Sequence, residues 1–275
     1  MINMDSLQPH IILDKLGTSL FAQNIIFQRS LDSTNTIAKE LAAQGAPEGT
    51  LVLAEEQRAG KGRMGRRWVS PGYVNLLFSL LMRPKIHKDQ VFVTTMILAL
   101  ATIEAIRSRT GLTPTIKWPN DLFVAGKKLG GILTEFSMSH DDIDYVVLGL
   151  GLNVNWSPDQ REEVSHPATS ILAETGSKIS RNELLVSILM TFEMYYRQVL
   201  SGHIDDFYRT WNEASMIIGR NVEIVSPKEK THGKALRIDR NGALVIQDNA
   251  GKERKIISGD VSISLPHRSK SLKPC

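Results

Sequence analysis

The sequence is poor in cysteine and in long apolar runs. Its single cysteine is Cys275, the last residue, which excludes an internal disulfide framework and a zinc site built from cysteines. No apolar stretch reaches the roughly 18 residues that a membrane-spanning helix needs. The first residues, MINMDSLQPHIILDKLG, lack the cationic segment and apolar core of a secretory signal. These absences predict a protein of the reducing cytoplasm, with no membrane span.

Several common catalytic motifs are also missing. No G-x-S-x-G, H-E-x-x-H, Walker A or Cys-x-x-Cys pattern occurs, and the seven histidines are scattered. The net charge is only +4, and no basic stretch alternates with aromatic residues. A catalytic triad, a histidine metal site and a nucleic-acid surface are therefore disfavoured. A chain of 275 residues with 42% hydrophobic content instead predicts a substantial core and a small second domain.

A loop rich in glycine and arginine lies between two apolar runs and forms the centre of the chemically informative region. It comprises Gly60, Lys61, Gly62, Arg63, Gly65, Arg66 and Arg67. Unhindered backbone N–H groups and fixed guanidinium charges suit a phosphate and a carboxylate held close together. The glycines match G-x-G-x-x-G, but a dinucleotide site needs a helix there, and Pro71-Gly72 would end it. The loop therefore predicts a site for an acid and a nucleotide.

Polar residues begin a short predicted helix before this loop. Ser33, Thr34 and Asn35 precede apolar positions at helical spacing. Such residues cap helices, and they also hold polar ligands through the free N–H groups of a helix start. Both interpretations remain open from the sequence.

Three more stretches combine a turn or glycines with polar groups. Lys117 and Trp118 precede a Pro-Asn-Asp turn, Lys128 precedes Gly130-Gly131, and the run YVVLGLGLNVN places Gly149, Gly151 and Asn153 on one strand face. Ordinary turn chemistry, a surface lysine and tight packing are the structural alternatives. The functional interpretation is a lysine aimed at a ligand, beside a strand face with room for a planar group.

Hydrophobic periodicity predicts the order of the elements. Strands are expected over 51–55, 74–81, 115–117, 122–124 and 145–155, and helices over 89–109, 166–174, 182–200 and 204–214. From 219 onward five short strands are expected, at 221–225, 231–238, 243–247, 254–257 and 261–264, with Asn241-Gly242 as a hairpin turn. The pattern predicts an α/β (α+β) fold, with a mixed sheet, helices on one face and a small C-terminal β-barrel.

Five motifs in register carry a family resemblance. Ser33-Thr34-Asn35, Gln57 with GKGRMGRRWVSP, KWPNDL, KLGGILTE and GLGLNVN closely resemble the catalytic region of biotin protein ligases. The resemblance implies a class II synthetase-like catalytic domain at 25–216 and an SH3-like β-barrel at 217–265, with a lead-in segment at 1–24 and a basic tail at 266–275. Residues 1–24 are too few for a helix-turn-helix domain, so the short form without DNA binding is expected.

The resemblance implies a two-step reaction that uses biotin, ATP and Mg²⁺. Biotin is activated to biotinyl-5′-AMP and then transferred to a lysine of a biotin carboxyl carrier protein, such as that of acetyl-CoA carboxylase. By resemblance, Lys128 and Arg63 are catalytic. The implied biotin-binding residues are Ser33, Thr34, Asn35, Gln57, Gly60, Lys61, Gly62, Arg63, Lys128 and Gly131; the ATP and adenylate residues are Arg66, Trp68, Lys117, Asn120, Asp121, Gly149, Gly151 and Asn153. The metal ligands stay unassigned.

One departure and two alternatives accompany this hypothesis. Lys61 stands where the family loop usually has arginine, which keeps the charge but loses the bidentate fork, and predicts looser retention of the adenylate. A lipoate or octanoate ligase or transferase of the same fold is the alternative enzyme. A biotin-sensing regulator without enzymatic activity is the second alternative. The presence of Lys128 disfavours it. A monomer and a homodimer are both compatible with the sequence.

Overall fold

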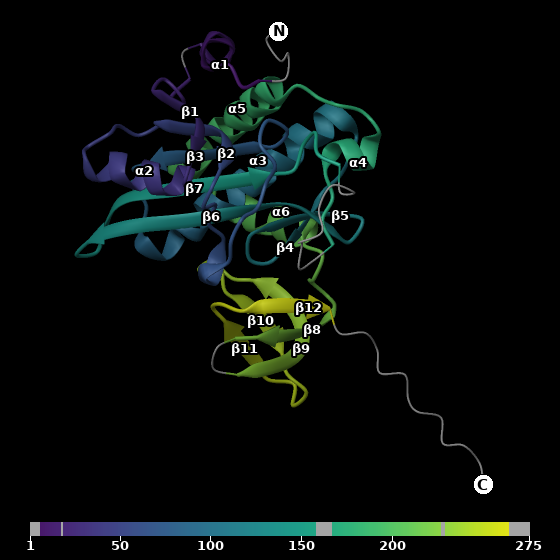
Figure 1. The fold of residues 1–275 in the computed structure, drawn as a ribbon. Coiled ribbons are helices and arrows are strands. Elements are labelled where there is room, and N and C mark those ends of the chain that lie inside the picture. The colour runs from purple at the N-terminus through teal and green to yellow at the C-terminus, as the bar shows by residue number, and fades with distance from the viewer. Residues whose placement is uncertain (1–5, 18, 158–166, 227–228, 264–275) are drawn as a thin grey trace.

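A seven-stranded sheet forms the centre of the protein in the computed structural model, which describes residues 6–17, 19–157, 167–226 and 229–263. Figure 1 shows this sheet above a smaller C-terminal sheet. The strand order is β1 (Ile25–Leu31), β2 (Leu51–Gln57), β3 (Leu76–Met82), β7 (Asp142–Leu152), β6 (Lys127–Ser139), β5 (Asp121–Val124), β4 (Thr115–Lys117). The β1–β2 pair is parallel and the other pairs are antiparallel. The predicted mixed sheet is confirmed.

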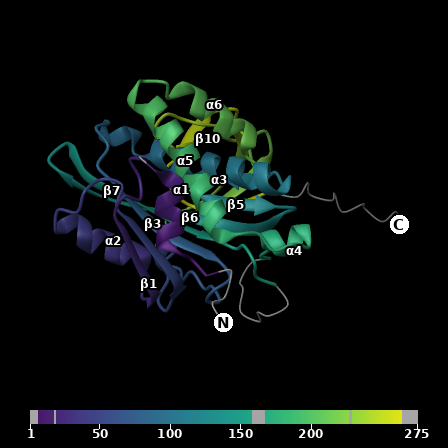
Figure 2. The same ribbon diagram turned by 90° about the horizontal axis from the view of Figure 1, so that it is seen from above.

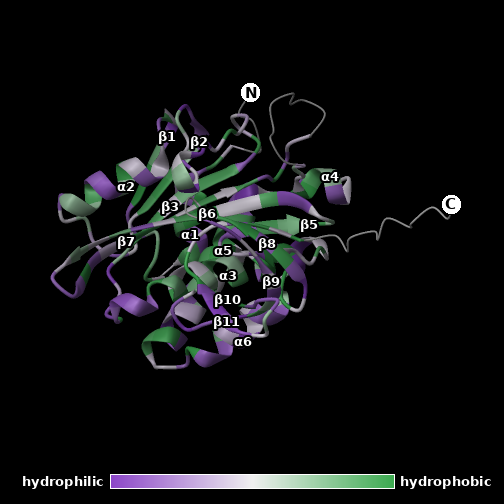
Figure 3. Ribbon diagram, turned by 90° about the horizontal axis from the view of Figure 1, so that it is seen from below, coloured by the Kyte–Doolittle hydropathy of each residue, from purple (hydrophilic) through white to green (hydrophobic). Residues whose placement is uncertain are grey.

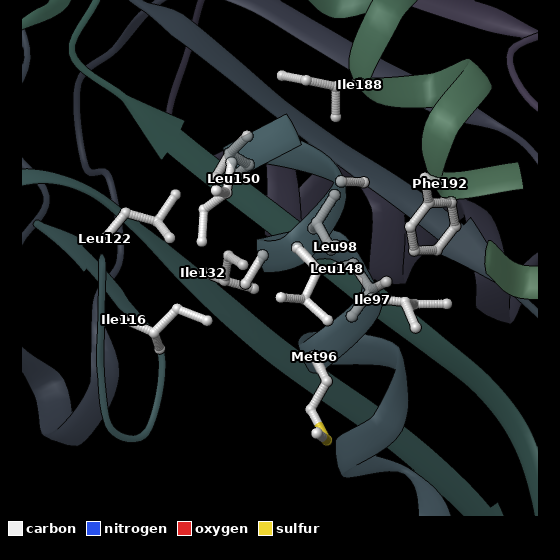
Figure 4. Close-up of a cluster of buried hydrophobic side chains, with 14 of the residues drawn as sticks. Met96, Ile97, Leu98, Ile116, Leu122, Ile132, Leu148, Leu150, Ile188 and Phe192 are labelled. Carbon is white, nitrogen blue, oxygen red and sulfur yellow. The ribbon is translucent and has the colours of Figure 1, made fainter. Parts of the chain in front are cut away.

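Helices cover both faces of this sheet (Figure 2). Helices α3 (Phe92–Thr110) and α5 (Arg181–Leu200) pack on one face, where their apolar side chains meet those of β4 to β7 (Figure 4). Helix α2 (Thr34–Ala43) covers the other face through Ala38 and Ala42, which pack with residues of β2, β3 and β7. The expectation of helices on a single face was therefore incomplete, because α2 packs on the opposite side.

Burial from both sides explains the sequence of β3. All seven residues, LLFSLLM, are buried, because helices cover both faces of this central strand. A strand in that position reads as a continuous apolar run rather than an alternating one. Figure 3 shows the contrast with helix α2, which alternates between hydrophobic and hydrophilic positions because one of its faces meets solvent.

The sequence did not predict the first helix. Helix α1 (Pro9–Leu16) packs against α5 and buries Ile12 and Leu16 in the main core. The backbone before it is also held, since the N–H of Leu7 donates to Glu55 Oε1 at 2.7 Å. The described part of the lead-in segment therefore shares its core with the large sheet.

The helix expected over 166–174 is shorter than predicted. Helix α4 spans Ile171–Thr175, while Ala168 forms an isolated bridge with Lys128 and Ser170 caps the helix by accepting from the N–H of Ala173. His166 lies outside the described residues. The backbone of residues 167–169 hydrogen-bonds to Lys128 of β6 instead of forming the first turn of a helix. The expected helix over 204–214 is confirmed as α6 (Asp205–Ala214).

The small C-terminal unit is a five-stranded antiparallel sheet. Its order is β11 (Glu253–Ile256), β10 (Leu244–Gln247), β9 (Lys230–Ile238), β8 (Asn221–Val225), β12 (Asp260–Ile263), so β11 and β12 are the edges. Gly242 has φ 80°, as the predicted Asn-Gly turn requires. The indole N–H of Trp118 donates to the carbonyl of Gly242 at 2.9 Å, which joins this sheet to the larger unit.

Helix α3, with the turn before it, is long and apolar enough to cross a bilayer by length and composition alone. Within the protein, 72% of its most apolar window is buried. Its apolar residues pack against α5 and the sheet, and this packing accounts for its composition.

Candidate active site

The loop of glycine and arginine residues closes as a short hairpin beside an open cavity. Lys61 and Arg67 form an antiparallel bridge, and the N–H of Gly62 donates to the carbonyl of Arg66 at 2.7 Å. Met64 and Gly65 turn the chain with φ 55° and 74°. The cavity has a volume of about 590 Å³ and is lined by residues 59–67, Leu133 and Glu135. The loop therefore forms one wall, and strand β6 forms the other.

The polar end of the site, which we define as Thr34, Asn35, Gln57 and Ser79, lies at the start of α2. The N–H of Thr34 donates to Gln57 Oε1 at 2.7 Å, and the Thr34 hydroxyl lies 3.1 Å from the same oxygen. Ser33 precedes the helix and is buried, but its side chain makes no capping hydrogen bond. The expected cap is thus replaced by the Gln57 side chain, which satisfies a free N–H of the helix.

Asn35 ties this helix start to strands β3 and β6. Its Nδ2 donates to the Leu133 carbonyl at 3.1 Å and to Glu135 Oε2 at 2.9 Å, while Ser79 Oγ lies 2.6 Å from its Oδ1. Lys39 donates to the second Glu135 oxygen at 2.5 Å. Burial alone would raise the pKa of Glu135, but the hydrogen bonds from Lys39 and Asn35 outweigh it and hold this pKa below its ordinary value. Glu135 is therefore an ionised part of the cavity wall.

The cationic end of the site, which we define as Arg63, Lys117, Asn120, Asp121 and Lys128, forms where β4, β5 and β6 meet. Lys128 Nζ lies 2.8 Å from Asp121 Oδ1 and 5.7 Å from the centre of the Trp68 ring. Arg63 reaches across from the loop, with Nη1 3.4 Å from Asn120 Oδ1. These contacts join the glycine-rich loop to the Pro-Asn-Asp turn and gather three cations.

Partial burial affects two of these cations. Burial lowers the pKa of Lys117, although Asp121 opposes this effect. Burial likewise lowers the pKa of Arg63, again against the attraction of Asp121. Desolvation disfavours a charged group until an anion arrives to pair with it. The cationic end is thus suited to bind an anionic ligand.

Glycines of the site leave space that other side chains of the protein fill. A Cβ on Gly149 would lie 1.9 Å from Asn35 Oδ1, and a Cβ on Gly151 would lie 2.5 Å from Cε2 of Trp68. A Cβ on Gly131 would lie 3.0 Å from Asp121 Oδ1. The sequence left two alternatives for Gly149 and Gly151, room for a planar ligand or tight packing within the protein. In this structure both glycines are tightly packed, against Asn35 and Trp68.

The side chains of Asn153 and Arg66 bind to parts of the protein outside the cavity, the chain after β7 and strand β12. The Asn153 amide donates to the Thr169 carbonyl at 2.9 Å, so it anchors the chain that follows β7. Arg66 Nη2 lies 2.6 Å from Asp260 Oδ1 of β12, an ion pair between the loop and the C-terminal sheet. Both side chains of this pair are about half exposed, so its contribution to stability is small.

Sequence reasoning missed Ser79, Glu135 and Lys39. Ser79 is the lone hydroxyl within the apolar run of β3, and a polar residue buried on both sides needs a partner. Glu55 in β2 gives the same signal, and it pairs with Arg181 at 2.7 Å, both side chains being fully buried. An isolated polar residue within an apolar strand is the signal that would have found Ser79, whereas Lys39 in α2 and Glu135 in the mixed sequence of β6 carry no such signal.

Dedicated metal ligands are not grouped in the described part of the chain. Among those residues, no cluster of three or more histidine, cysteine, aspartate or glutamate side chains has the geometry to hold a metal ion. The oxygen donors nearest the cations are Asp121 and Asn120.

Comparisons with known proteins agree with this geometry. Residues 27–153 match the profile described as "Biotin/lipoate A/B protein ligase family", and residues 217–264 match "Biotin protein ligase C terminal domain". A relative from Bacillus subtilis, "Bifunctional ligase/repressor BirA", is 37% identical over 249 residues, covering 90% of this chain and 76% of that protein. The chain belongs to the biotin protein ligase family.

Other members of the biotin protein ligase family match over similar lengths. "Biotin--[acetyl-CoA-carboxylase] ligase" of Paracoccus denitrificans is 32% identical, covering 81% of this chain and 93% of that protein. The solved structure "Biotin protein ligase from Aquifex aeolicus in complex with biotin and ATP" has a TM-score of 0.75 and 28% identity, covering 88% of this chain and 99% of that one. The family resemblance seen in the motifs is thus confirmed over both folded units.

Proposed function

We propose that this protein is an ATP-dependent biotin protein ligase. In the first step a carboxylate oxygen of biotin attacks the α-phosphorus of ATP, the bond to the bridging oxygen breaks, and pyrophosphate leaves. In the second step a lysine amine of a carrier protein attacks the acyl carbon of biotinyl-5′-AMP and releases AMP. The observation that carries this proposal is one cavity that adjoins both the polar end, through Glu135, and the cationic end, through Arg63.

The cationic end suits the chemistry of the first step. A carboxylate and a triphosphate repel each other, so fixed positive charges are needed where they meet. Asp121 holds the Lys128 ammonium at 2.8 Å, which orients it before any ligand arrives. Arg63 is held by Asn120 and partly desolvated, so its attraction for developing charge on phosphorus is screened less than in water. Lys128 and Arg63 thus act by orientation and electrostatics, with the acceptor lysine as nucleophile.

Mg²⁺ enters this proposal with the nucleotide. A magnesium ion at a phosphate site typically takes one or two carboxylates and keeps the substrate phosphates and waters as its other ligands. Asp121, which pairs with Lys128 in this structure, is the carboxylate at the cationic end that could contribute to such a site. Bound there, the ion would neutralise charge on the phosphates.

The polar end favours biotin over lipoate or octanoate. Thr34 and Gln57 carry hydrogen-bonding groups that match the cyclic urea of biotin, while the buried Asn35 and Ser79 hydrogen-bond to their neighbours and support this end of the site. The dithiolane ring of lipoate and the alkyl chain of octanoate carry no such groups, so they would leave buried polar atoms unsatisfied. Sites built for hydrogen bonding reject analogues that lack the partner group by large factors.

The partner and the setting follow from the same proposal. The acceptor is a biotin carboxyl carrier protein or domain of a biotin-dependent carboxylase, because the product of the first step requires an amine acceptor. A reducing cytoplasm suits a chain whose single cysteine is its last residue. No role for DNA is proposed, and either a monomer or a homodimer would present the cavity.

The decisive experiment measures pyrophosphate release from ATP with biotin, lipoate or octanoate, each with and without a biotin carboxyl carrier domain. Wild type, Lys128→Ala and Lys127→Ala are compared. Lys127 is the adjacent, exposed lysine and pairs with Glu174 at 3.5 Å, so its variant is the matched control. Biotin-dependent release that is lost only in Lys128→Ala, followed by carrier labelling, is expected. Release with lipoate or octanoate but not biotin would overturn the proposed substrate.

A further inference from the structure

The backbone of Lys128 is held by a segment that lies outside the named strands of the sheet. The N–H of Lys128 donates to the carbonyl of Pro167 at 2.9 Å, and its carbonyl accepts from the N–H of Thr169 at 2.8 Å. Strand β7 pairs with β6 only from Gly130 onward, so the segment 167–169 takes the place of β7 beside Lys128. This segment therefore fixes both backbone groups of the lysine that carries the proposed chemistry.

Asn153 fastens this segment to the end of β7. Its Nδ2 donates to the carbonyl of Thr169 at 2.9 Å, and its backbone carbonyl accepts from the N–H of Ile171 at 3.2 Å. Asn153 is 5% exposed and Thr169 is fully buried, so losing the side-chain bond would leave buried polar groups unsatisfied. The position of Thr169, and with it the backbone of Lys128, thus depends on the orientation of the Asn153 amide.

Asn75 sets that orientation. The N–H of Val154 can only donate, and it meets Asn75 Oδ1 at 2.9 Å, so the Asn75 nitrogen must face its other neighbours. This nitrogen lies 2.9 Å from Ser70 Oγ and 3.4 Å from Asn153 Oδ1. It therefore supplies the hydrogen that the Asn153 oxygen accepts, which leaves the Asn153 nitrogen to donate to Thr169. A flip of either amide would place two donors or two acceptors against each other.

Asn75 is itself held from the core. Its side chain is fully buried, and its backbone carbonyl accepts from Arg181 Nη1 at 2.9 Å. Arg181 is fixed in turn by its buried ion pair with Glu55 at 2.7 Å. Asn75 and Asn153 do not line the cavity. A series of buried contacts therefore runs from a core ion pair to the backbone of Lys128.

We propose that Asn75 is a positioning residue for Lys128, acting through Asn153 and the segment 167–169. By fixing the lysine backbone at the start of β6, Asn75 determines where the ammonium stands beside Asp121, 2.8 Å away, for the first step. A lysine side chain is long and flexible, so orienting its charge requires both a fixed backbone and a fixed partner. The inference rests on the proposed ligase function, because it concerns the lysine of that reaction.

The test compares Asn75→Ala and Asn75→Ser with Asn212→Ala. Asn212 is the matched control, because its Oδ1 likewise accepts from a backbone N–H, that of Ile238, and its Nδ2 donates to the carbonyl of Tyr208. It joins α6 to β9 and has no part in the contacts that lead to Lys128. The pyrophosphate assay gives kcat and the KM values for biotin and ATP. Thermal melting shows that each variant is folded, and Asn75→Ser, which keeps a polar side chain, provides the result if Asn75→Ala does not fold.

Both Asn75 variants should lower kcat by about tenfold, the effect of one lost hydrogen bond on the barrier, with both KM values within about threefold. Asn212→Ala should melt at a lower temperature but keep its kcat. An unchanged kcat in the Asn75 variants, or a rise in KM with kcat retained, would overturn the inference. An equal loss of kcat in Asn212→Ala would overturn it too, because general destabilisation would then explain the effect. If the wild type releases no pyrophosphate with biotin, the proposed function fails instead, so the two failures are distinguishable.

Discussion

Replacing Gly151 by alanine tests whether the packing of Trp68 positions the cationic end. The added Cβ would lie 2.5 Å from Cε2 of Trp68 and 2.8 Å from Cζ2 and Nε1. Carbon atoms in contact normally lie 3.5–4.0 Å apart, so the indole must move by about 1 Å or more. Overpacking of this kind costs about 1–3 kcal/mol. Movement of the ring away from the Lys128 ammonium, now 5.7 Å from its centre, removes about 0.5–1 kcal/mol more.

We therefore expect Gly151→Ala to lower the free energy of unfolding by about 1.5–4 kcal/mol, measured by urea denaturation. The rate of biotinyl-AMP formation should fall as well, because Lys128 loses one of its supports. Gly72→Ala is the matched control: its Cβ would meet Glu56 at 3.5 Å, an ordinary contact, so its stability should change by less than about 0.5 kcal/mol.

A double-mutant cycle decides whether Trp68 is responsible. If the clash is with the indole, Gly151→Ala should cost little in a Trp68→Ala background, where the space is free. An equal cost in both backgrounds would refute this reasoning, because the strain would then come from another neighbour of β7.

Three further predictions concern single charges. Arg181→Met should destabilise the fold by about 3–5 kcal/mol in urea unfolding, because it removes the cation that pairs with fully buried Glu55; a loss below 1 kcal/mol would contradict this. Burial lowers the pKa of Lys117, so its charge is present below that pKa and is lost as pH rises through it. KM for ATP should therefore begin to rise at a lower pH than it would if Lys117 had the pKa of an exposed lysine. The Lys117→Arg variant should show this rise at higher pH, and identical pH profiles of KM for the two proteins would refute the role of Lys117 at the nucleotide. Lys61→Arg should slow the release of biotinyl-AMP in a trapping assay, and unchanged release would exclude bidentate retention.

The sequence by itself determined the local features of this protein. Turn residues, capping residues and hydrophobic periodicity are properties of neighbouring positions, so the bounds of β4, β8 and α6 were predicted to within a residue. The five motifs also identified the family, because each of them, including the glycine-rich loop and the stretch around Lys128, is a short run of consecutive residues. Strand β1 and helix α1 were missed. Strand β1 lies at the sheet edge with only Leu31 buried, so its pattern carries little alternation.

Only the tertiary structure decided which side chains meet. The contact of Ser79 with Asn35 joins residues 44 positions apart, that of Asn35 with Glu135 spans 100, and that of Arg66 with Asp260 spans 194. Such pairings depend on sheet register and on the face where α2 docks, which local patterns do not specify. Packing also decided which side chains lie beside Gly149 and Gly151. A glycine in the sequence indicates that space is free, but it does not indicate that Asn35 and Trp68 occupy that space. The sequence therefore identifies the chemical groups that are present, and the packing of strands and helices decides which of these groups come together in a site.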